Sequence, residues 1–398
     1  MANSKKAILL IMDGVGDLPT PKTPLQVAKK PNLDSLAKKG SLGQLYPVKP
    51  FVTPGSDTAH LNILGYDPYS IYQGRGPLEA LGLGMTLLPG DVAFRANFAT
   101  IKDGKIVDRR AGRVDTQTSS KLAPLLNMKI DDVEVIFKSA SEHRGALILR
   151  GPALSPAITA TDAHESEILP QCTPLNKDGA KTARIVNEFT KISMERLASS
   201  PLNSSRSLPA NVLLLRGAAT FTKVPTFKEK YGIDAACVAG GALYKGVARY
   251  IGMNVLDVPL ATGDKNTDLS AKAKATLDAL KTHDFVFLHF KATDNAGHDG
   301  DFALKKKMIE RVDKELIPSL VKSGAYLVVT GDHSTPVSRK AHSGHPVPFL
   351  VYGKDERPDK TKKFDEFESA QGSLGKIDGQ NVIPLILNLL EKGKKYGS

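Results

Sequence analysis

The chain has 398 residues, of which 41% are hydrophobic and 24% charged, a balance typical of a globular protein and not of a disordered one. No apolar run is long enough to span a membrane, so we expect no membrane partner and a cytoplasmic location. The 54 Lys and Arg against 42 Asp and Glu give a net charge of +12, but these residues are scattered, which favours a small anionic partner over nucleic acid.

The apolar segments are short and alternate between strand-like and helix-like patterns. A stretch rich in Ser and Pro, residues 198–209, is typical of a linker. The predicted strands are residues 7–12, 92–99, 105–109, 133–138, 145–151, 212–215, 235–239, 285–290, 325–330 and 348–352. The predicted helices are residues 31–39, 117–127, 179–198, 242–252, 268–281, 301–322 and 380–392, together with one that begins near Ser56.

This order predicts an α/β fold with a mostly parallel sheet flanked by helices and an inserted, smaller α+β cap domain. The alternation of strand and helix is interrupted once, where strand-like segments follow one another. We therefore expect a core formed by residues 1–94 and 209–398, and a cap formed by residues 95–208.

Three acidic residues follow three of the predicted core strands. Asp13 ends the first strand, Asp294 lies four residues after the strand 285–290, and Asp332 follows the strand 325–330. Because ligands of a parallel sheet bind beyond the carboxyl ends of its strands, these acids are expected to meet at one edge.

Histidines accompany two of these acids. His298 lies four residues after Asp294, His333 follows Asp332 directly, and His342 and His345 come shortly afterwards. Each residue alone is more often a turn, a cap or a structural histidine, but together they favour a metal centre with ligands enough for two ions.

Ser56 is the candidate nucleophile. It stands at the predicted start of a helix, in the segment 54–60, and a serine there is usually only an N-cap. The same position also exposes backbone N–H groups and the positive end of the helix dipole, which can hold a phosphoryl group.

Several segments together resemble a known family. The chain looks like the alkaline phosphatase superfamily and, more closely, the cofactor-independent phosphoglycerate mutases of the archaeal type, from residue 8 to about residue 351. The matching segments are Asp13-Gly14, residues 55–62, 75–84, 108–113, 143–145, 239–246, 294–300, 331–336 and 342–348.

This resemblance implies an alkaline-phosphatase-like core with two divalent ions. It places one metal on Asp13, Ser56, Asp332 and His333, and the other on Asp294, His298 and His342, with His345 as a spare imidazole. Mn²⁺ is expected first, and the ligands also admit Zn²⁺, Co²⁺ or Mg²⁺.

The reaction that the resemblance implies is the interconversion of 3-phosphoglycerate and 2-phosphoglycerate in glycolysis and gluconeogenesis. It would pass through a phosphoserine on Ser56 and need no bisphosphoglycerate. Lys245 resembles the lysine that the family directs at the phosphoryl group, and Asp162 is a candidate for proton transfer.

Cations of the cap are candidates for binding the substrate carboxylate, since arginine pairs with carboxylate and phosphate in a fork geometry. An arginine-rich run here is otherwise a solvated hairpin. The candidate substrate-binding residues are Arg109, Arg110, Arg113, His143, Arg144, His164 and Arg216.

Two alternatives remain at this stage. One is a metal-dependent phosphomonoesterase or a phosphopentomutase-like phosphosugar mutase, because the same core serves all of these. The other is a basic binding protein without catalytic activity, which the intact ligand set argues against. A homo-oligomer is compatible with the sequence, which does not set the oligomeric state.

Overall fold

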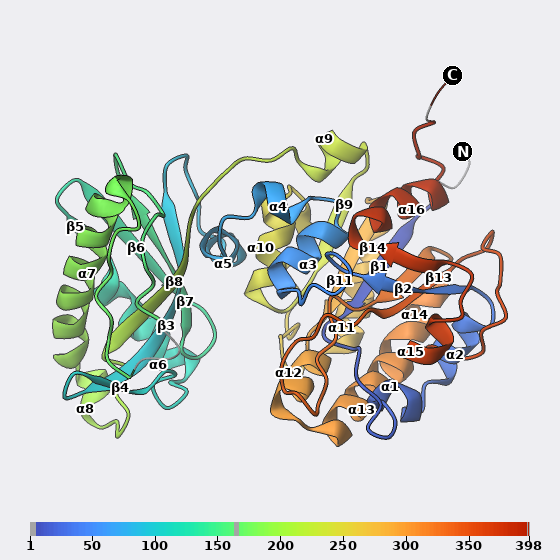
Figure 1. Ribbon diagram of the computed structural model, residues 1–398, viewed down its shortest axis with the longest axis horizontal. Coiled ribbons are helices and arrows are strands. Elements are labelled where there is room, and N and C mark those ends of the chain that lie inside the picture. The colour runs from blue at the N-terminus through green and yellow to red at the C-terminus, as the bar shows by residue number, and fades with distance from the viewer. Residues whose placement is uncertain (1–4, 163–166, 396, 398) are drawn as a thin grey trace. The chain divides into compact units, whose positions relative to one another are not determined.

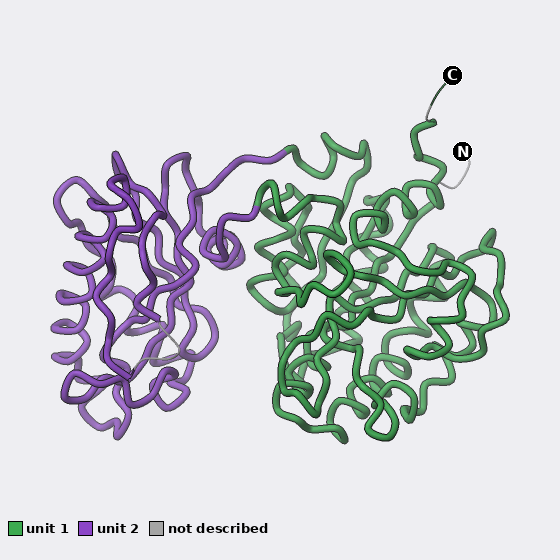
Figure 2. The backbone as a smooth tube through the Cα atoms, viewed as in Figure 1, with its two compact units in different colours: residues 1–71, 225–398 green, residues 72–224 purple. Residues whose placement is uncertain are grey.

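The computed structural model describes residues 5–162, 167–395 and 397 (Figure 1). The chain folds into two compact units (Figure 2): unit 1, Met1–Ile71 with Pro225–Ser398, and unit 2, Tyr72–Val224. Unit 2 is therefore inserted in the sequence of unit 1. Its ends lie at residues 72 and 224, whereas the sequence placed them at 95 and 208.

Unit 1 is built on an eight-stranded sheet of order β10-β9-β11-β1-β12-β13-β2-β14. Only β13 runs against the others, since it is antiparallel to both of its neighbours. The strands are β1 (Ala7–Met12), β2 (Ser41–Tyr46), β9 (Ala235–Val238), β10 (Asn254–Val255), β11 (Phe285–Phe290), β12 (Tyr326–Thr330), β13 (Val347–Tyr352) and β14 (Gly375–Asp378). The mostly parallel sheet is thus confirmed.

Helices cover both faces of this sheet, so β1, β11 and β12 are buried along their whole length. Alternate residues of β1, beginning with Ile8, pack in one core with residues of α2, α11 and α13, and His60 of α3 contacts β11 from the other side. The helices are α1 (Pro24–Val27), α2 (Pro31–Ala37), α3 (Ser56–Ile63), α4 (Pro68–Ile71), α9 (Phe227–Tyr231), α10 (Ala242–Tyr250), α11 (Leu269–Ala279), α12 (Ala292–Asp299), α13 (Phe302–Arg311), α14 (Ile317–Lys322), α15 (Glu366–Ser369) and α16 (Val382–Leu389).

The predicted helix 301–322 is divided in the structure. A π-helical turn, Val312–Leu316, separates α13 from α14, and Pro318 stands in the first turn of α14. Proline lacks a backbone N–H, so it is accommodated where a helix begins and not in its interior.

Unit 2 is an antiparallel sheet covered by helices. The strand order is β4-β3-β7-β6-β5, and β3 pairs in addition with β8. The strands are β3 (Val92–Lys102), β4 (Lys105–Asp108), β5 (Met128–Ile130), β6 (Val133–Ser139), β7 (Arg144–Arg150) and β8 (Val212–Thr220). The helices are α5 (Gly76–Gly82), α6 (Thr116–Leu122), α7 (Ala180–Ala198) and α8 (Pro201–Ser204).

The sequence analysis placed the strand at 212–215 in the core sheet. In the structure it does not join the unit 1 sheet. It belongs to β8, which pairs antiparallel with β3, and Leu213 lies opposite Phe98. The segment 198–209 contains α8 and leads into this strand, so it is not the connection between the two units.

The points at which the chain leaves and re-enters unit 1 lie close together. The Tyr66 hydroxyl donates a hydrogen bond of 2.8 Å to the Pro225 carbonyl, and Tyr231 donates one of 2.8 Å to the Gly65 carbonyl. The segment before α4 is therefore fixed to the segment that follows the insertion.

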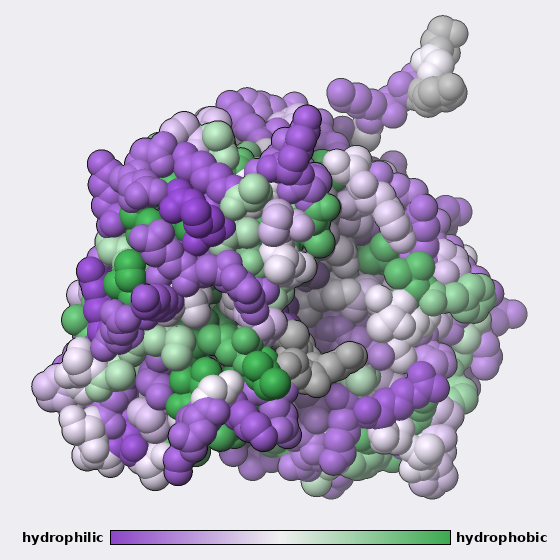
Figure 3. Space-filling view, turned by 60° about the vertical axis from the view of Figure 1, so that its left-hand side comes forward, coloured by the Kyte–Doolittle hydropathy of each residue, from purple (hydrophilic) through white to green (hydrophobic). Residues whose placement is uncertain are grey.

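Within the described residues, no helix is long and apolar enough to cross a membrane. Hydrophilic residues cover most of the face shown in Figure 3, with a smaller hydrophobic region in its lower half. Among the described residues, the large hydrophobic side chain with the highest exposed fraction is that of Phe51, which is 87% exposed.

Candidate active site

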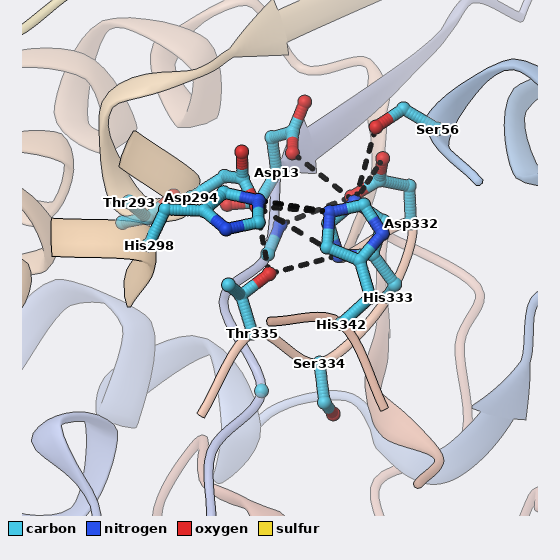
Figure 4. Close-up of polar contacts among 12 residues, drawn as sticks. Asp13, Ser56, Thr293, Asp294, His298, Asp332, His333, Ser334, Thr335 and His342 are labelled. Carbon is cyan, nitrogen blue, oxygen red and sulfur yellow. Dashed lines mark hydrogen bonds and ion pairs between the residues drawn. The ribbon is translucent and has the colours of Figure 1, made fainter. Parts of the chain in front are cut away.

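The three predicted acids meet at one edge of the unit 1 sheet (Figure 4). Asp13 follows β1, Asp332 follows β12 and Asp294 lies in the first turn of α12, which follows β11. All three carboxylates are buried. Because β11, β1 and β12 are neighbours in the sheet, their carboxyl ends bring the acids together, as the sequence predicts.

Among the described residues, two groups of side chains could each hold a cation. One consists of Asp294, His333 and His342, and the other of Asp13, Asp332 and His333. His333 therefore belongs to both groups, which the sequence did not reveal.

The predicted ligand His298 belongs to neither group, but its ring faces His342 of the first group. His298 Nε2 lies 3.1 Å from His342 Nε2, and each lies 3.5 Å from Asp294 Oδ1. The Nδ1 atoms contact the carbonyls of Lys340 at 3.0 Å and Pro54 at 2.9 Å. A carbonyl only accepts, so both Nδ1 atoms carry protons, and both Nε2 atoms are left to face the carboxylate.

In the second group, His333 Nε2 lies 3.5 Å from Asp13 Oδ1 and 3.2 Å from Asp332 Oδ2. The other oxygen of Asp332 accepts a hydrogen bond of 3.0 Å from the Gly14 backbone N–H. Asp13 Oδ2 lies 2.9 Å from Nε2 of His289, a buried residue of β11. Each carboxylate is thus held by one oxygen while the other faces His333.

Ser56 lies against this second group. It is the first residue of α3, and its Oγ is 3.1 Å from His333 Nε2. His60, one turn later, contacts the Ser56 carbonyl through Nδ1 at 2.6 Å. The nucleophile candidate is therefore fixed at a helix start, beside the imidazole that the two groups share.

A lysine neutralises part of the acidic charge. Lys291 Nζ lies 3.1 Å from Asp13 Oδ1 and 2.5 Å from Asp294 Oδ2. Burial alone would raise the pKa of Asp294, but nearby positive charge, foremost that of Lys291, outweighs it and holds that pKa well below its usual range. Asp294 is therefore ionised at neutral pH.

The donor set fits divalent cations. Among the described residues, the buried Asp332 Oδ2 has no hydrogen-bond partner. The unprotonated Nε2 atoms of His298 and His342 lie 3.1 Å apart, an arrangement that a bound cation would satisfy. Mixed carboxylate and imidazole donors suit Mn²⁺ or Zn²⁺ better than Ca²⁺.

Comparison with known proteins identifies the family. A model of the metalloenzyme superfamily matches residues 5–389. A relative from Methanococcus maripaludis (strain C7), named 2,3-bisphosphoglycerate-independent phosphoglycerate mutase, is 46% identical over 406 residues, covering 99% of this chain and 100% of the relative. The chain belongs to this mutase family.

Two solved structures agree with this mutase assignment. One, of a protein from Pyrococcus horikoshii, has a TM-score of 0.87 and 38% identity and covers 99% of this chain and 100% of its own. The other, a cofactor-independent phosphoglycerate mutase from Thermoplasma acidophilum, has a TM-score of 0.72 and 38% identity and covers 97% and 100%.

The other candidate residues of this mutase lie mostly in unit 2. Asp162 is buried and forms an ion pair of 2.8 Å with Arg109 and one of 3.4 Å with Arg216. Arg216 lies within β8, so it belongs to unit 2 and not to the core. His164 lies outside the described residues.

A cluster of cations surrounds His143. This histidine is buried, and its burial, together with the charges of nearby arginines, lowers its pKa to about 4. The arginines are Arg144, Arg110, Arg95 and Arg113. The imidazole of His143 is therefore neutral at neutral pH, and the charge of this cluster is carried by its arginines.

Arg95 belongs to this cluster, although the sequence did not single it out. Burial and the charges of neighbouring arginines lower its pKa to about 10, and within the described part of the chain its buried Nε has no hydrogen-bond partner. The sequence could have singled out Arg95 by its position inside the strand-like segment 92–99, because a charged side chain in a buried strand is unusual.

Two predicted residues lie apart from the ligand groups. Lys245 Nζ is 3.6 Å from Asp257 Oδ1, and it makes no hydrogen bond to Ser56 in the described structure. The two ligand groups contain His342 and not His345, whose Nδ1 contacts the Ser343 hydroxyl at 3.0 Å.

The loop after β1 is anchored by a buried lysine. Lys305 Nζ donates to Asp17 Oδ2 at 2.8 Å and to the Gly16 carbonyl at 3.0 Å. Glu366 accepts hydrogen bonds from the Asp17 backbone N–H and the Thr23 hydroxyl. Burial raises the pKa of Glu366 to about 7.

Glu366→Gln is expected to stabilise the metal-free protein more at about pH 8 than at about pH 5. The native state keeps a proton on Glu366 that the unfolded state loses above about pH 4.5, so wild-type stability falls as the pH rises through 7. The neutral amide removes this loss, about 1–3 kcal/mol.

Thermal unfolding of both proteins at both pH values measures this difference. The exposed Glu195 on α7 offers a control, because Glu195→Gln should change stability equally little at both pH values. A difference between wild type and Glu366→Gln that does not change with pH would contradict the prediction.

Proposed function

We propose that this chain interconverts 3-phosphoglycerate and 2-phosphoglycerate through a phosphoserine on Ser56, at a centre that binds two divalent metal ions. The observation that carries the proposal is the contact of 3.1 Å between Ser56 Oγ and His333 Nε2, because His333 belongs to both groups of candidate ligands. The full-length similarity to mutases of this name supports the same reaction.

We assign the ligands to two ions by adding Ser56 and His298 to residues of the two groups and by giving His333 to the ion beside Ser56. One ion would take Asp13, Ser56, Asp332 and His333, and the other Asp294, His298 and His342, with Mn²⁺ as the expected ion. His333 stands close enough to both groups to contact either. When bound, the ions would stabilise negative charge on the transferring phosphoryl group and favour ionisation of the serine hydroxyl.

In the first half-reaction, Ser56 Oγ forms a bond to phosphorus as the bond between phosphorus and the substrate oxygen breaks. The serine hydroxyl loses one proton and the released glycerate hydroxyl gains one, so protons balance. The helix start of α3 holds Ser56 in place and directs backbone N–H groups towards the phosphoryl group. The second half-reaction is the reverse, with the other hydroxyl of glycerate.

Between the two half-reactions the glycerate must stay bound, which requires cations for its carboxylate. The arginines around His143 supply such charges on unit 2. A phosphomonoesterase would have no comparable need to retain the organic product, so these cations favour the mutase.

A coupled assay tests this proposal. The protein is stripped with a chelator, Mn²⁺ is restored, and 3-phosphoglycerate is supplied without bisphosphoglycerate while enolase converts 2-phosphoglycerate into phosphoenolpyruvate. We expect turnover only with metal. Release of free phosphate in place of turnover would indicate a phosphomonoesterase, and no turnover with Mn²⁺, Zn²⁺, Co²⁺ or Mg²⁺ would overturn the mutase.

A further inference from the structure

Thr335 lies between residues of both ligand groups, although it is not itself a ligand candidate (Figure 4). Its hydroxyl is 2.7 Å from Asp294 Oδ1 and 3.0 Å from His333 Nδ1. Thr335 and His333 are fully buried, and Asp294 is 2% exposed. Water therefore does not compete for these two contacts.

The number of protons decides the direction of both hydrogen bonds. An ionised carboxylate only accepts, so the single proton of the Thr335 hydroxyl is donated to Asp294. The hydroxyl oxygen must then accept from His333, which requires a proton on His333 Nδ1. Nε2 is consequently the nitrogen of His333 that could bind a cation, and it faces Ser56, Asp13 and Asp332.

Histidines 298 and 342 reach the same state by a simpler route. Their Nδ1 atoms contact the carbonyls of Lys340 and Pro54, which can only accept. His333 has no carbonyl partner at Nδ1 in the described structure, and its partner is a hydroxyl that could donate or accept. The direction of this hydrogen bond is fixed by the Asp294 carboxylate, which accepts the proton of the Thr335 hydroxyl.

The position of Thr335 is fixed by its own backbone. Its carbonyl accepts a hydrogen bond of 2.8 Å from Lys305 Nζ, and its N–H donates one of 3.1 Å to the Gly16 carbonyl. A Cβ at Gly14, where φ is +62°, would lie 2.5 Å from Thr335 Oγ1, so only glycine leaves room for the hydroxyl.

We propose that Thr335 is a positioning residue that holds the proton of His333 on Nδ1 and so presents Nε2 to the metal centre. The proposal rests on the proposed function only in taking His333 as a ligand. Outer hydrogen bonds of this kind orient ligand histidines, and their loss typically lowers metal affinity by about 10–100-fold.

The variants Thr335→Val and Thr335→Ser separate the hydroxyl from the shape of the side chain. Valine keeps the shape and removes the hydroxyl, whereas serine keeps the hydroxyl. We expect Thr335→Val to weaken the binding of Mn²⁺, measured by titration calorimetry, by about 10–100-fold, and Thr335→Ser to stay close to wild type. The adjacent Ser334 is the matched control, because it is buried and its hydroxyl points away from the cluster (Figure 4).

Ser334→Ala is therefore expected to leave Mn²⁺ binding unchanged. Equal weakening by Thr335→Val and Thr335→Ser, or by Ser334→Ala, would show that the loop and not the hydroxyl matters. It would overturn the proposal.

A second measurement, of the tautomer of His333, uses no substitution at position 335 and so does not depend on such a variant folding. The ¹⁵N shifts of the ring nitrogens distinguish the two neutral tautomers, and they can be recorded on metal-free, histidine-labelled wild type at about pH 9. The chain has nine histidines, so His333→Asn identifies the resonances of His333 by their loss.

A proton on Nδ1, in the neutral or the doubly protonated ring, supports the proposal, and a ring that carries its only proton on Nε2 overturns it. Failure of the proposed function has a different signature, because wild type would then bind no Mn²⁺ or show no turnover, whatever the tautomer of His333.

Discussion

Ser56→Ala is expected to abolish mutase turnover, with a loss of about 10⁴-fold or more, because it removes the hydroxyl beside His333 to which the phosphoryl group would be transferred. The change removes one oxygen from a buried side chain, and it leaves the helix start intact because the N-cap of α3 is Gly55 and not Ser56. The coupled assay measures the loss. Incubation of wild type with substrate, followed by acid quench and mass spectrometry, should show a phosphorylated peptide that contains Ser56.

The exposed Ser70 of α4 provides a matched control. Its hydroxyl donates to the Asp67 carbonyl, away from the ligand groups, and Ser70→Ala should keep full turnover and the phosphorylated peptide. Substantial turnover by Ser56→Ala would contradict a phosphoserine route. Loss of turnover by Ser56→Ala with unchanged Mn²⁺ binding would show that Ser56 acts as the nucleophile and is not needed as a metal ligand.

Asp332→Asn is expected to have the second largest effect, a loss of turnover of about 10³-fold and of one of two bound ions. The amide keeps the size of the side chain and an oxygen for the Gly14 N–H, but it removes the negative charge that faces His333. Loss of one ion removes several kcal/mol of charge stabilisation from the transition state, and each 1.36 kcal/mol corresponds to about tenfold in rate.

Metal content after dialysis, measured by plasma mass spectrometry, tests this directly. Asp278→Asn on the surface of α11 is the control, because its ion pair with Lys281 is exposed and contributes little. An Asp332→Asn protein that retains two tightly bound ions would exclude Asp332 as an essential ligand.

The fold and the acids of the site could be predicted because they depend on local sequence. The strands at 7–12 and 285–290 have the predicted bounds, since they are short apolar runs with polar residues at both ends. An acid directly after such a strand must lie at the sheet edge. The prediction that Asp13, Asp294 and Asp332 converge therefore needed only the order of strands and helices along the chain.

The remaining features depend on pairing between distant segments, which no local pattern records. The strand at 212–215 looked like one more core strand, yet its partner is β3, more than a hundred residues earlier. The contact of Lys291 with two carboxylates and the place of His333 in both ligand groups arise only when three loops meet. Thr335 looked like part of a turn until its two neighbours were known.

The hydrogen bond between Tyr66 and Pro225 has a consequence for how such an enzyme can diversify. The chain leaves unit 1 and returns to it at adjoining points. Changes in the length or sequence of unit 2 therefore need not alter the sheet of unit 1. The residues of unit 2 can then be exchanged while the ligand groups of unit 1 are retained. Chemistry and selectivity are thereby inherited as separate modules of a single gene.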